Sequence, residues 1–325
     1  MMRSPRAWMG ALFALLLAGI AAVASAQPYP NRPVQLVVPA AVGGSTDLFA
    51  RKFAQQLEKH LGQPVVILNK GGGGGSIATG DVARSKPDGY TLLMSTTGNA
   101  VINPLTMQLG FDPNKELVPI AMLGFVPFCI EINPSLNATN VEQFIAAVKA
   151  APGKYAYATN GNGGFIHMIT ALFSRQAGLD MVAVPYPGGS AMQQDLIAGR
   201  VPIYFDALNS ALRFHRSGQT RVIATTGAQR SPIAPDIPTV SESGLPGYVA
   251  ETAFILTAPA GTPPAVIDRL LAASQKAVAD EAFRKDLEEM AVRPVVDSNP
   301  RASADYIRAE FEKWTPVVQT LKAAN

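Results

Sequence analysis

The stretch VQLVVPAAVGGSTDLFAR, residues 34–51, joins an apolar run to the start of a helical pattern through a turn rich in small residues. Val34–Val38 predicts a buried strand, because short apolar runs bounded by turn signals are typical of covered strands. From Asp47 to Leu61 apolar residues recur at helical spacing, and Gly62 stands where a glycine commonly ends a helix. The stretch therefore predicts a strand–loop–helix unit, the building block of an α/β fold.

The same alternation continues along the chain and begins again near residue 141. Strands are predicted at 65–68 and 90–94, with a short helix at 77–83 between them. In the second half the predicted strands are 155–158, 181–184, 201–205 and 221–225, and the predicted helices are 141–150, 168–176 and 191–198. Helices at 264–279, 282–290 and 302–321 end the chain, with a short strand at 293–296. Strands that alternate with helices indicate parallel sheets with right-handed crossovers.

Two such units in a chain of this length predict two α/β lobes. Two extended apolar segments, 125–132 and 249–258, are the expected crossing strands between the lobes. If both cross, the first lobe is discontinuous and contains residues 27–124 and 251–325, while the second lobe contains residues 125–250. We therefore expect a two-lobed α/β protein with two crossing strands.

Residues 1–26 have the features of a secretory signal peptide. Arg3 and Arg6 precede an apolar stretch, and Ala24-Ser25-Ala26 fits a small-residue cleavage site. The alternative is an uncleaved membrane anchor, since about 18 apolar residues can span a bilayer. The Ala-x-Ala site and the absence of charges on the far flank favour cleavage near Ala26 and Gln27. We expect the mature chain to be exported and retained in the periplasm.

The composition argues against several classes of function. Removal of the two leader arginines leaves a formal net charge close to zero, which gives no support for binding of nucleic acid or of an anionic membrane. The three histidines and the single cysteine are widely spaced, so we expect no metal site and no cofactor. The glycine run at 71–75 lacks both a Gly-Lys-Ser/Thr motif and an acid after the next strand, which argues against a bound nucleotide.

Four joins between a strand and a helix share a polar, glycine-rich composition: residues 42–47, 95–99, 159–164 and 187–190. In an open parallel sheet such joins lie at the carboxyl ends of the strands, where ligands bind, and glycine lets backbone N–H groups face a ligand. A helix N-terminus adds about half a positive charge. Because these joins contain no arginine or lysine, we expect a cleft that holds carboxylates through backbone and hydroxyl donors.

A series of short motifs follows in order along the mature chain. They include Pro39-x-x-x-Gly43-Gly44-x-Thr46-Asp47, Lys86-Pro87-Asp88-Gly89-Tyr90, Ala158-Thr159-Asn160-Gly161, Val184-Pro185-Tyr186-x-Gly188, Asp236-Ile237-Pro238-Thr239-Val240 and Ala258-Pro259-Ala260-Gly261-Thr262-Pro263. In this number and order they resemble the Bug receptors, the TctC-like extracytoplasmic solute-binding proteins of tripartite tricarboxylate transporters.

The resemblance implies a periplasmic-binding-protein fold of the Venus flytrap type, whose two α/β lobes close on a small carboxylated solute. It implies a monomeric receptor without catalytic activity, recognised in its closed form by membrane transporter subunits that are encoded separately. The ligand-binding residues that it implies are Gly43, Gly44, Ser45, Asp47, Ser95, Thr96, Thr159, Asn160, Gly161, His167, Tyr186 and Asp206.

Several alternatives stay open at the level of the sequence. Asp47 and Asp206 either accept hydrogen bonds from the solute or stabilise the protein itself. The same fold in a ligand sensor would present its closed form to a signalling protein. An exported hydrolase with Ser45 as nucleophile would need a base within about 3 Å of the hydroxyl, whereas Ser45 or Thr46 is more simply a helix N-cap. The segment Ala40-Ala41-Val42 stands where the family often carries an aromatic residue and prolines, which leaves more room in the expected pocket.

Overall fold

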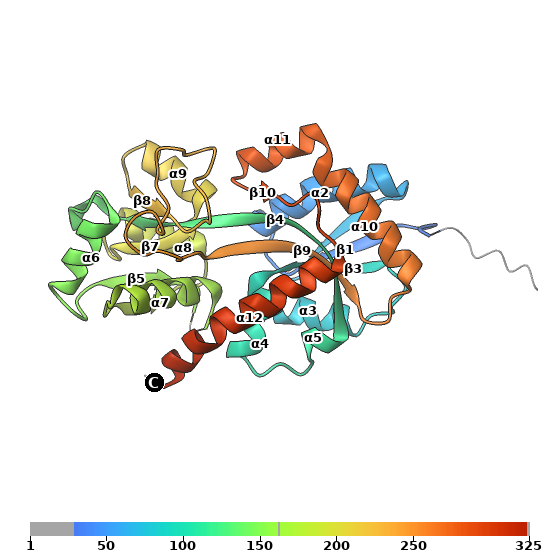
Figure 1. Ribbon diagram of the computed structural model, residues 1–325, viewed down its shortest axis with the longest axis horizontal. Coiled ribbons are helices and arrows are strands. Elements are labelled where there is room, and N and C mark those ends of the chain that lie inside the picture. Colours follow the sequence, from blue (N-terminus) through green and yellow to red (C-terminus); the bar gives the residue numbers. More distant parts are fainter. Residues whose placement is uncertain (1–28, 162, 324–325) are drawn as a thin grey trace, which may run out of the picture.

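The computed structural model describes residues 29–161 and 163–323 (Figure 1). The predicted signal peptide, residues 1–26, lies outside the described residues. Two groups of strands and helices are joined by two long strands, and the C-terminal helix runs from one group toward the other. Within the described ranges, no helix is long and apolar enough to cross a membrane.

The first lobe is built on three parallel strands and the helices between them. Strand β1 (Val34–Val38) lies between β2 (Val65–Asn69) and β3 (Thr91–Thr96). Helix α2 (Ser45–Leu61) connects β1 to β2 and ends where Gly62 adopts a φ of 75° and donates its N–H to a carbonyl of the last turn. The shorter elements of this lobe are η1 (Gly73–Gly75), α3 (Ser76–Ala83), η2 (Gly98–Ile102), α4 (Asn103–Thr106) and α5 (Pro113–Glu116).

Strand β4 (Leu117–Ile132) passes from one lobe to the other (Figure 1). Its first part pairs antiparallel with β9 (Glu251–Pro259), which also pairs with β3. Its last part pairs with β7 (Ile203–Ala207) and β8 (Arg221–Thr225) of the second lobe. The strand order is β2-β1-β3-β9-β4-β7-β5-β6, with β8 and β10 also paired to β4. The two lobes and two crossing strands confirm the predicted fold class, whereas the residue boundaries of the lobes stay a prediction.

The second lobe repeats the α/β pattern. Its remaining strands are β5 (Ala156–Thr159) and β6 (Val182–Pro185), and its helices are η3 (Pro134–Leu136), α6 (Val141–Lys149), α7 (Phe165–Ala177), α8 (Gly189–Ile197) and α9 (Leu208–Arg216). Strand β5 pairs in parallel with β6 and with β7. The carboxyl ends of these strands therefore lie at one edge of the sheet, where the joins to α7 and α9 begin.

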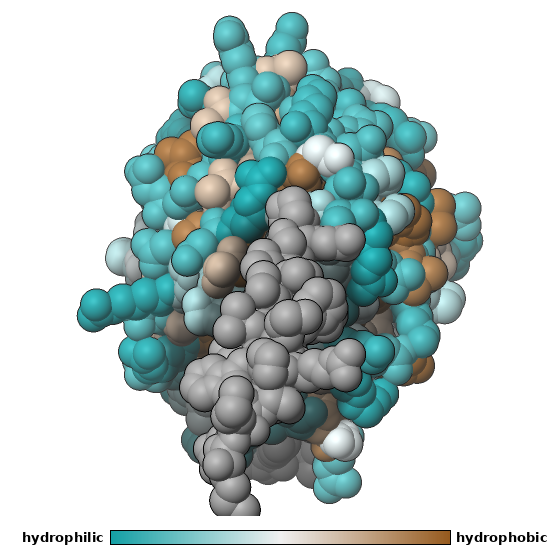
Figure 2. Space-filling model, turned by 90° about the vertical axis from the view of Figure 1, so that its right-hand side faces the viewer, coloured by the Kyte–Doolittle hydropathy of each residue, from teal (hydrophilic) through white to brown (hydrophobic). Residues whose placement is uncertain are grey.

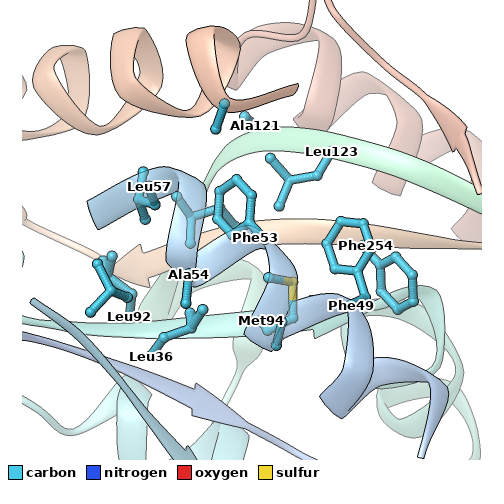
Figure 3. Close-up of a cluster of buried hydrophobic side chains, with 14 of the residues drawn as sticks. Leu36, Phe49, Phe53, Ala54, Leu57, Leu92, Met94, Ala121, Leu123 and Phe254 are labelled. Carbon is cyan, nitrogen blue, oxygen red and sulfur yellow. The ribbon is translucent and has the colours of Figure 1, made fainter. Parts of the chain in front are cut away.

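Each lobe has a large hydrophobic core, and the core of the second lobe extends to Val101 and Ile102 of η2. In the first lobe, Phe49 and Phe53 of α2 pack over the sheet, and the Phe49 ring stacks on Phe254 of β9 with ring centroids 4.0 Å apart (Figure 3). In the second lobe, Phe173 of α7 makes edge contacts with Phe205 and Tyr248. Full burial of such side chains contributes about 1.5–3 kcal/mol each, so both lobes have large hydrophobic contributions to stability.

The C-terminal helices return to the first lobe and then reach across. Helix α10 (Pro264–Ala279) and α11 (Glu281–Glu289) cover the first core, and the short strand β10 (Arg293–Pro294) pairs with β4. Helix α12 (Pro300–Ala323) starts beside β4, and its later residues Trp314, Val317 and Val318 belong to the core of the second lobe. One helix thus packs on both lobes (Figure 1).

The described surface at the right-hand end of Figure 1 is mostly hydrophilic. Figure 2 shows hydrophobic residues scattered in small groups among hydrophilic ones over the part of this face that the described residues form. Scattered exposed apolar side chains are normal in folded proteins and by themselves do not mark an interface.

Candidate ligand-binding site

Two adjoining cavities lie between the lobes, with volumes of about 150 Å³ (cavity A) and about 210 Å³ (cavity B). Both are lined by Thr46, Thr96, Gly98 and Phe165. Cavity A continues along the crossing strands, and its further lining residues are Ser45, Val126, Phe128, Ala207, Thr252 and Phe254. Cavity B extends toward the glycine run and the second lobe, and its further lining residues are Pro39, Gly74, Asn99, Asn103, Met107, Asn160 and Gly164. We call the two together the interlobe cavities.

The start of α2 supplies hydroxyl groups to these cavities. The N-cap of α2 is Gly44, in an extended conformation and without a side-chain cap, so the expectation that Ser45 or Thr46 caps the helix is wrong. Residues 42 and 43 form a turn and only Gly44 is extended, so Ser45 is the first residue of the helix. In the described part of the chain, no hydrogen bond engages the hydroxyl of Ser45 or Thr46. Both hydroxyls are therefore available to a ligand.

Asp47 holds the loop before α2 rather than lining a cavity. Its carboxylate accepts hydrogen bonds from the Gly43 N–H at 2.7 Å, from Asn69 Nδ2 at 2.9 Å and from Arg51 Nε at 3.1 Å. Its side chain is almost completely buried. Burial pushes the pKa of Asp47 upward, but the hydrogen bonds from Arg51, Gly43 and Asn69 outweigh it and hold the pKa below its usual value. This geometry favours a structural role for Asp47. The Gly43 N–H is already hydrogen-bonded to Asp47 and is therefore not free for a ligand.

The end of β3 places its two predicted residues on opposite faces of the sheet. Thr96 lines both interlobe cavities, and its hydroxyl donates to Asn99 Oδ1 at 2.8 Å. Ser95 lines a different cavity beneath α12. Neighbouring residues of a strand alternate between faces, so the sequence position alone already implied that both could not face one cleft.

The glycine run forms a fixed wall of cavity B. The Gly74 carbonyl accepts hydrogen bonds from Asn99 Nδ2 at 2.8 Å and from Asn103 Nδ2 at 2.9 Å. Gly75 has a φ of 90°, and a Cβ placed on it would lie 2.3 Å from Asn99 Nδ2. Glycine is thus required by the positive φ and by the close packing of Asn99 and Pro39 against its Cα. Gly74, Asn99 and Asn103 thus form one wall of cavity B. Asn99 and Asn103 were not among the ligand-binding residues predicted from the sequence.

The loop before α7 contributes Asn160 from the second lobe. Asn160 lines cavity B, whereas Thr159 is fully buried, and neither Thr159 nor Gly161 lines an interlobe cavity. His167 is also buried, and its Nδ1 accepts a hydrogen bond from the Gly163 N–H at 2.9 Å. Burial lowers the pKa of His167, which keeps the ring neutral. His167 thus stabilises the loop before α7 through its hydrogen bond with Gly163.

Tyr186 and Asp206 have partners within the second lobe. The Tyr186 hydroxyl donates to Asp195 Oδ2 at 2.9 Å, and Asp206 Oδ1 accepts from the Ala207 N–H at 2.7 Å. Asp206 is buried, and burial raises its pKa to about 6 against the opposing hydrogen bonds. Neither residue lines an interlobe cavity, although Ala207 does.

Glu131 is a second buried acid on the same side of this sheet. Its Oε1 accepts hydrogen bonds from Gln193 Nε2 at 3.0 Å and from Thr220 Oγ1 at 2.5 Å. Its Oε2 and the Oε1 of Gln193 have no hydrogen-bond partner among the described residues, and both are acceptors. Burial raises the pKa of Glu131 to about 7, and the neighbouring Asp206 adds to the rise, while the Thr220 hydrogen bond opposes it. When Glu131 is protonated, its carboxyl group can donate a hydrogen bond, which the two unpaired acceptor oxygens of Glu131 and Gln193 lack.

We expect this buried acid to make stability fall as pH rises. The unfolded chain releases the Glu131 proton near 4.5, while the folded protein keeps it until about pH 7, so the free energy of unfolding decreases over this interval. Glu131→Gln removes the titration, and we expect the variant to gain on the order of 2 kcal/mol relative to the wild type between about pH 5 and pH 8. Urea unfolding at both pH values measures this gain. Glu131→Gln also removes the repulsion between Glu131 and Asp206, so the gain at the higher pH includes this interaction. A difference that is the same at both pH values would contradict the assignment.

The geometry gives no support to a nucleophile or a metal site. Within the described residues, no hydrogen bond links the Ser45 hydroxyl to a histidine or a carboxylate, and no group of three or more His, Cys, Asp or Glu side chains converges. The chemistry that the interlobe cavities offer is hydrogen-bond donation from hydroxyl, amide and helix N-terminal groups. Such donors suit the binding of an anion.

Two α/β lobes, two crossing strands and cavities between the lobes define the class of solute-binding proteins. The model of the tripartite tricarboxylate transporter family receptors, TctC, matches residues 49–323. The chain belongs to this family, which confirms the resemblance drawn from its motifs.

Individual relatives are similar over nearly the whole chain. Protein BugT of Bordetella pertussis is 37% identical over 308 residues, 93% of each chain. The structure of Rpa4515 of R. palustris with adipate superposes with a TM-score of 0.82 at 33% identity, covering 90% of this chain and 98% of that one. MatC from Rhodopseudomonas palustris with bound malate superposes with a TM-score of 0.80 at 30% identity, covering 89% of this chain and all of the other.

Proposed function

We propose that the protein is a periplasmic receptor that captures a small dicarboxylate in the interlobe cavities and delivers it to the membrane subunits of a tripartite tricarboxylate-type transporter. It acts as a monomer and without catalysis. The transporter subunits are encoded separately and recognise the closed form. The family membership and the two solved relatives that hold adipate and malate support this proposal.

The observation that carries the proposal is the meeting of two helix N-termini from opposite lobes. Helix α2 begins at Ser45 and α7 begins at Phe165, and both residues line cavity A. The N-cap of each helix is a glycine without a side-chain cap, Gly44 in one case and Gly164 in the other. The first N–H groups of a helix have no partner within the helix, and its dipole favours a negative charge there. Two such ends in opposite lobes suit a solute with two carboxylates.

The polarity of the interlobe cavities agrees with this type of recognition. Among the described residues that line them there is no arginine, lysine or histidine, so a bound carboxylate relies on the helix ends, the hydroxyls of Ser45 and Thr46 and the amide of Asn160. Apolar walls from Phe165 and Phe254 contact the carbon chain of the solute and exclude water. Hydrogen bonds to charged groups are stronger in such surroundings than in water.

Closure follows from the distribution of these groups over the two lobes. A ligand that contacts Ser45 and Asn160 at the same time stabilises the arrangement in which the lobes are close together. A ligand shifts a conformational equilibrium by its differential affinity for the two states, so the closed form gains population when the dicarboxylate binds.

Calorimetric titration of the mature protein with adipate, hexanoate and adipamide tests the proposal. Adipate has two carboxylates, hexanoate has one, and adipamide has the same length without charge. We expect adipate to bind at least ten times more tightly than hexanoate, a difference of about 1.4 kcal/mol or more, and adipamide not to bind measurably. At 100 times its dissociation constant the ligand should also stabilise the fold by about 2.7 kcal/mol. Equal affinity for adipate and adipamide would contradict anion recognition, and no binding of any of a series of di- and tricarboxylates would contradict the receptor function.

A further inference from the structure

A third cavity, of about 390 Å³, lies on the other face of the sheet from the interlobe cavities. We call it the α12 cavity, because one face of α12 forms its outer wall. Ser95 and Thr257 line it, whereas Thr96 and Phe254 of the same two strands, β3 and β9, line cavity A. Its volume falls within the range of about 300–1,000 Å³ that is typical of small-molecule sites. The α12 cavity is therefore separate from the proposed receptor site and larger than either of its parts.

The walls of the α12 cavity are mostly apolar. Ala304, Ile307 and Phe311 of α12 stand at positions that share one face of a helix, and this face is turned toward the cavity. Leu117 and Pro119 at the start of β4 form part of the opposite wall. An apolar ligand tail would bury surface on both sides, which is the main source of favourable free energy in such pockets.

The α12 cavity has one polar group in its interior and two at its exposed end. Ser95 is only 3% exposed and lines the interior, and its hydroxyl makes no hydrogen bond in the described part of the chain. The exposed side chains of Asn114 and Arg308 also line the cavity. Arg308 Nη1 lies 3.1 Å from Asp305, which uses one side of the guanidinium group. The guanidinium carries five N–H donors in all, so a carboxylate can engage the remaining ones.

We propose that the α12 cavity is a second binding site, which takes an amphipathic monocarboxylate such as a medium-chain fatty acid or an aryl-alkanoate. The apolar tail lies between α12 and β4, and the carboxylate pairs with Arg308 and Asn114. Octanoate is the probe for this site.

Calorimetric titration of the mature protein with octanoate, together with four variants, tests the second site. Arg308→Glu reverses the charge at the exposed end, and Ala304→Phe fills the interior. Arg301→Glu is the matched control, because it makes the same charge change on the same helix at a residue that does not line the cavity. Gly98→Leu fills the interlobe cavities and leaves the α12 cavity unchanged. Thermal unfolding of each variant checks that it is folded.

We expect octanoate to bind the wild type, Arg301→Glu and Gly98→Leu with one site and similar affinity, and to bind Arg308→Glu and Ala304→Phe at least tenfold more weakly. Arg308 is largely exposed, so its substitution leaves the fold intact even where Ala304→Phe does not. Loss of octanoate binding in Gly98→Leu would place the fatty acid in the interlobe cavities and overturn the inference. Unchanged affinity in Arg308→Glu, or no octanoate binding by the wild type, would overturn it as well. A failure of adipate to bind has no bearing on these outcomes.

Discussion

Replacement of Gly98 by leucine is expected to weaken dicarboxylate binding by at least 100-fold while leaving the protein folded. Gly98 lines both interlobe cavities, so a leucine side chain there occupies space that the ligand needs. Forcing additional methylene groups into filled space typically costs about 1–3 kcal/mol, and about 2.7 kcal/mol corresponds to 100-fold in affinity. Gly98 does not have a positive φ, so the substitution carries no backbone strain of that kind. Calorimetric titration with adipate measures the change, and thermal unfolding checks the fold.

Gly98→Ala is the matched control for this experiment. A Cβ on Gly98 would lie 3.4 Å from Thr96 Oγ1 and 3.9 Å from Phe165 Cβ, which are ordinary contacts. We therefore expect the alanine variant to bind adipate within about threefold of the wild type, a change of less than about 1 kcal/mol. If the leucine variant also retains wild-type affinity, the interlobe cavities do not hold the ligand.

Replacement of Trp314 by alanine is expected to produce the largest loss of stability among single substitutions in α12. The Trp314 side chain is fully buried in the core of the second lobe, and its Nε1 donates to Glu310 Oε2 at 2.7 Å. Truncation of a buried tryptophan leaves a cavity and typically costs about 3–5 kcal/mol. Urea unfolding monitored by far-ultraviolet circular dichroism measures this loss, since the signal does not depend on the tryptophan.

Two further variants separate packing from helix formation. Glu312→Ala changes an exposed position of the same helix and should alter stability by no more than about 0.5 kcal/mol. Trp314→Phe keeps most of the apolar contact with Phe165, whose ring centroid lies 6.1 Å from that of Trp314, and should cost less than the alanine variant. A loss of under about 1 kcal/mol in Trp314→Ala would contradict the role of α12 as a helix that is packed into the second lobe.

The alternation of strands and helices in the sequence was sufficient to predict the fold class, but not the full length of β4. The apolar pattern predicted a crossing segment that begins at residue 125, whereas β4 starts at Leu117. Pro119 and Pro127 lie within it, and proline argues against a strand because it cannot donate to the ladder. The structure accommodates Pro119 next to an irregularity in the pairing with β9. The irregular pairing depends on a strand that is distant in the sequence, so the residues around Pro119 do not predict it.

The polar joins between strands and helices predicted some of the residues that line the interlobe cavities. The lining residues that come together only through folding of distant segments were not predicted. Ser45, Thr96 and Asn160 line the interlobe cavities as the sequence analysis expected of ligand-binding residues. Phe165 and Phe254 also line them, but apolar side chains carry no chemical signature, and only the folded chain brings them together. The family motifs also predicted Asp47, His167, Tyr186 and Asp206 as ligand-binding residues, but the side chains of these four residues have hydrogen-bond partners within their own lobe.

A crystal structure of the protein with adipate bound would show whether one dicarboxylate is held between the N-termini of α2 and α7. We expect one carboxylate within hydrogen-bond distance of the first N–H groups of α2, near Ser45 and Thr46, and the other near the start of α7 at Phe165. We also expect the carbon chain to lie against Phe254 in cavity A. Adipate bound only outside the interlobe cavities, or bound there with both carboxylates away from the two helix ends, would rule out this mode of binding.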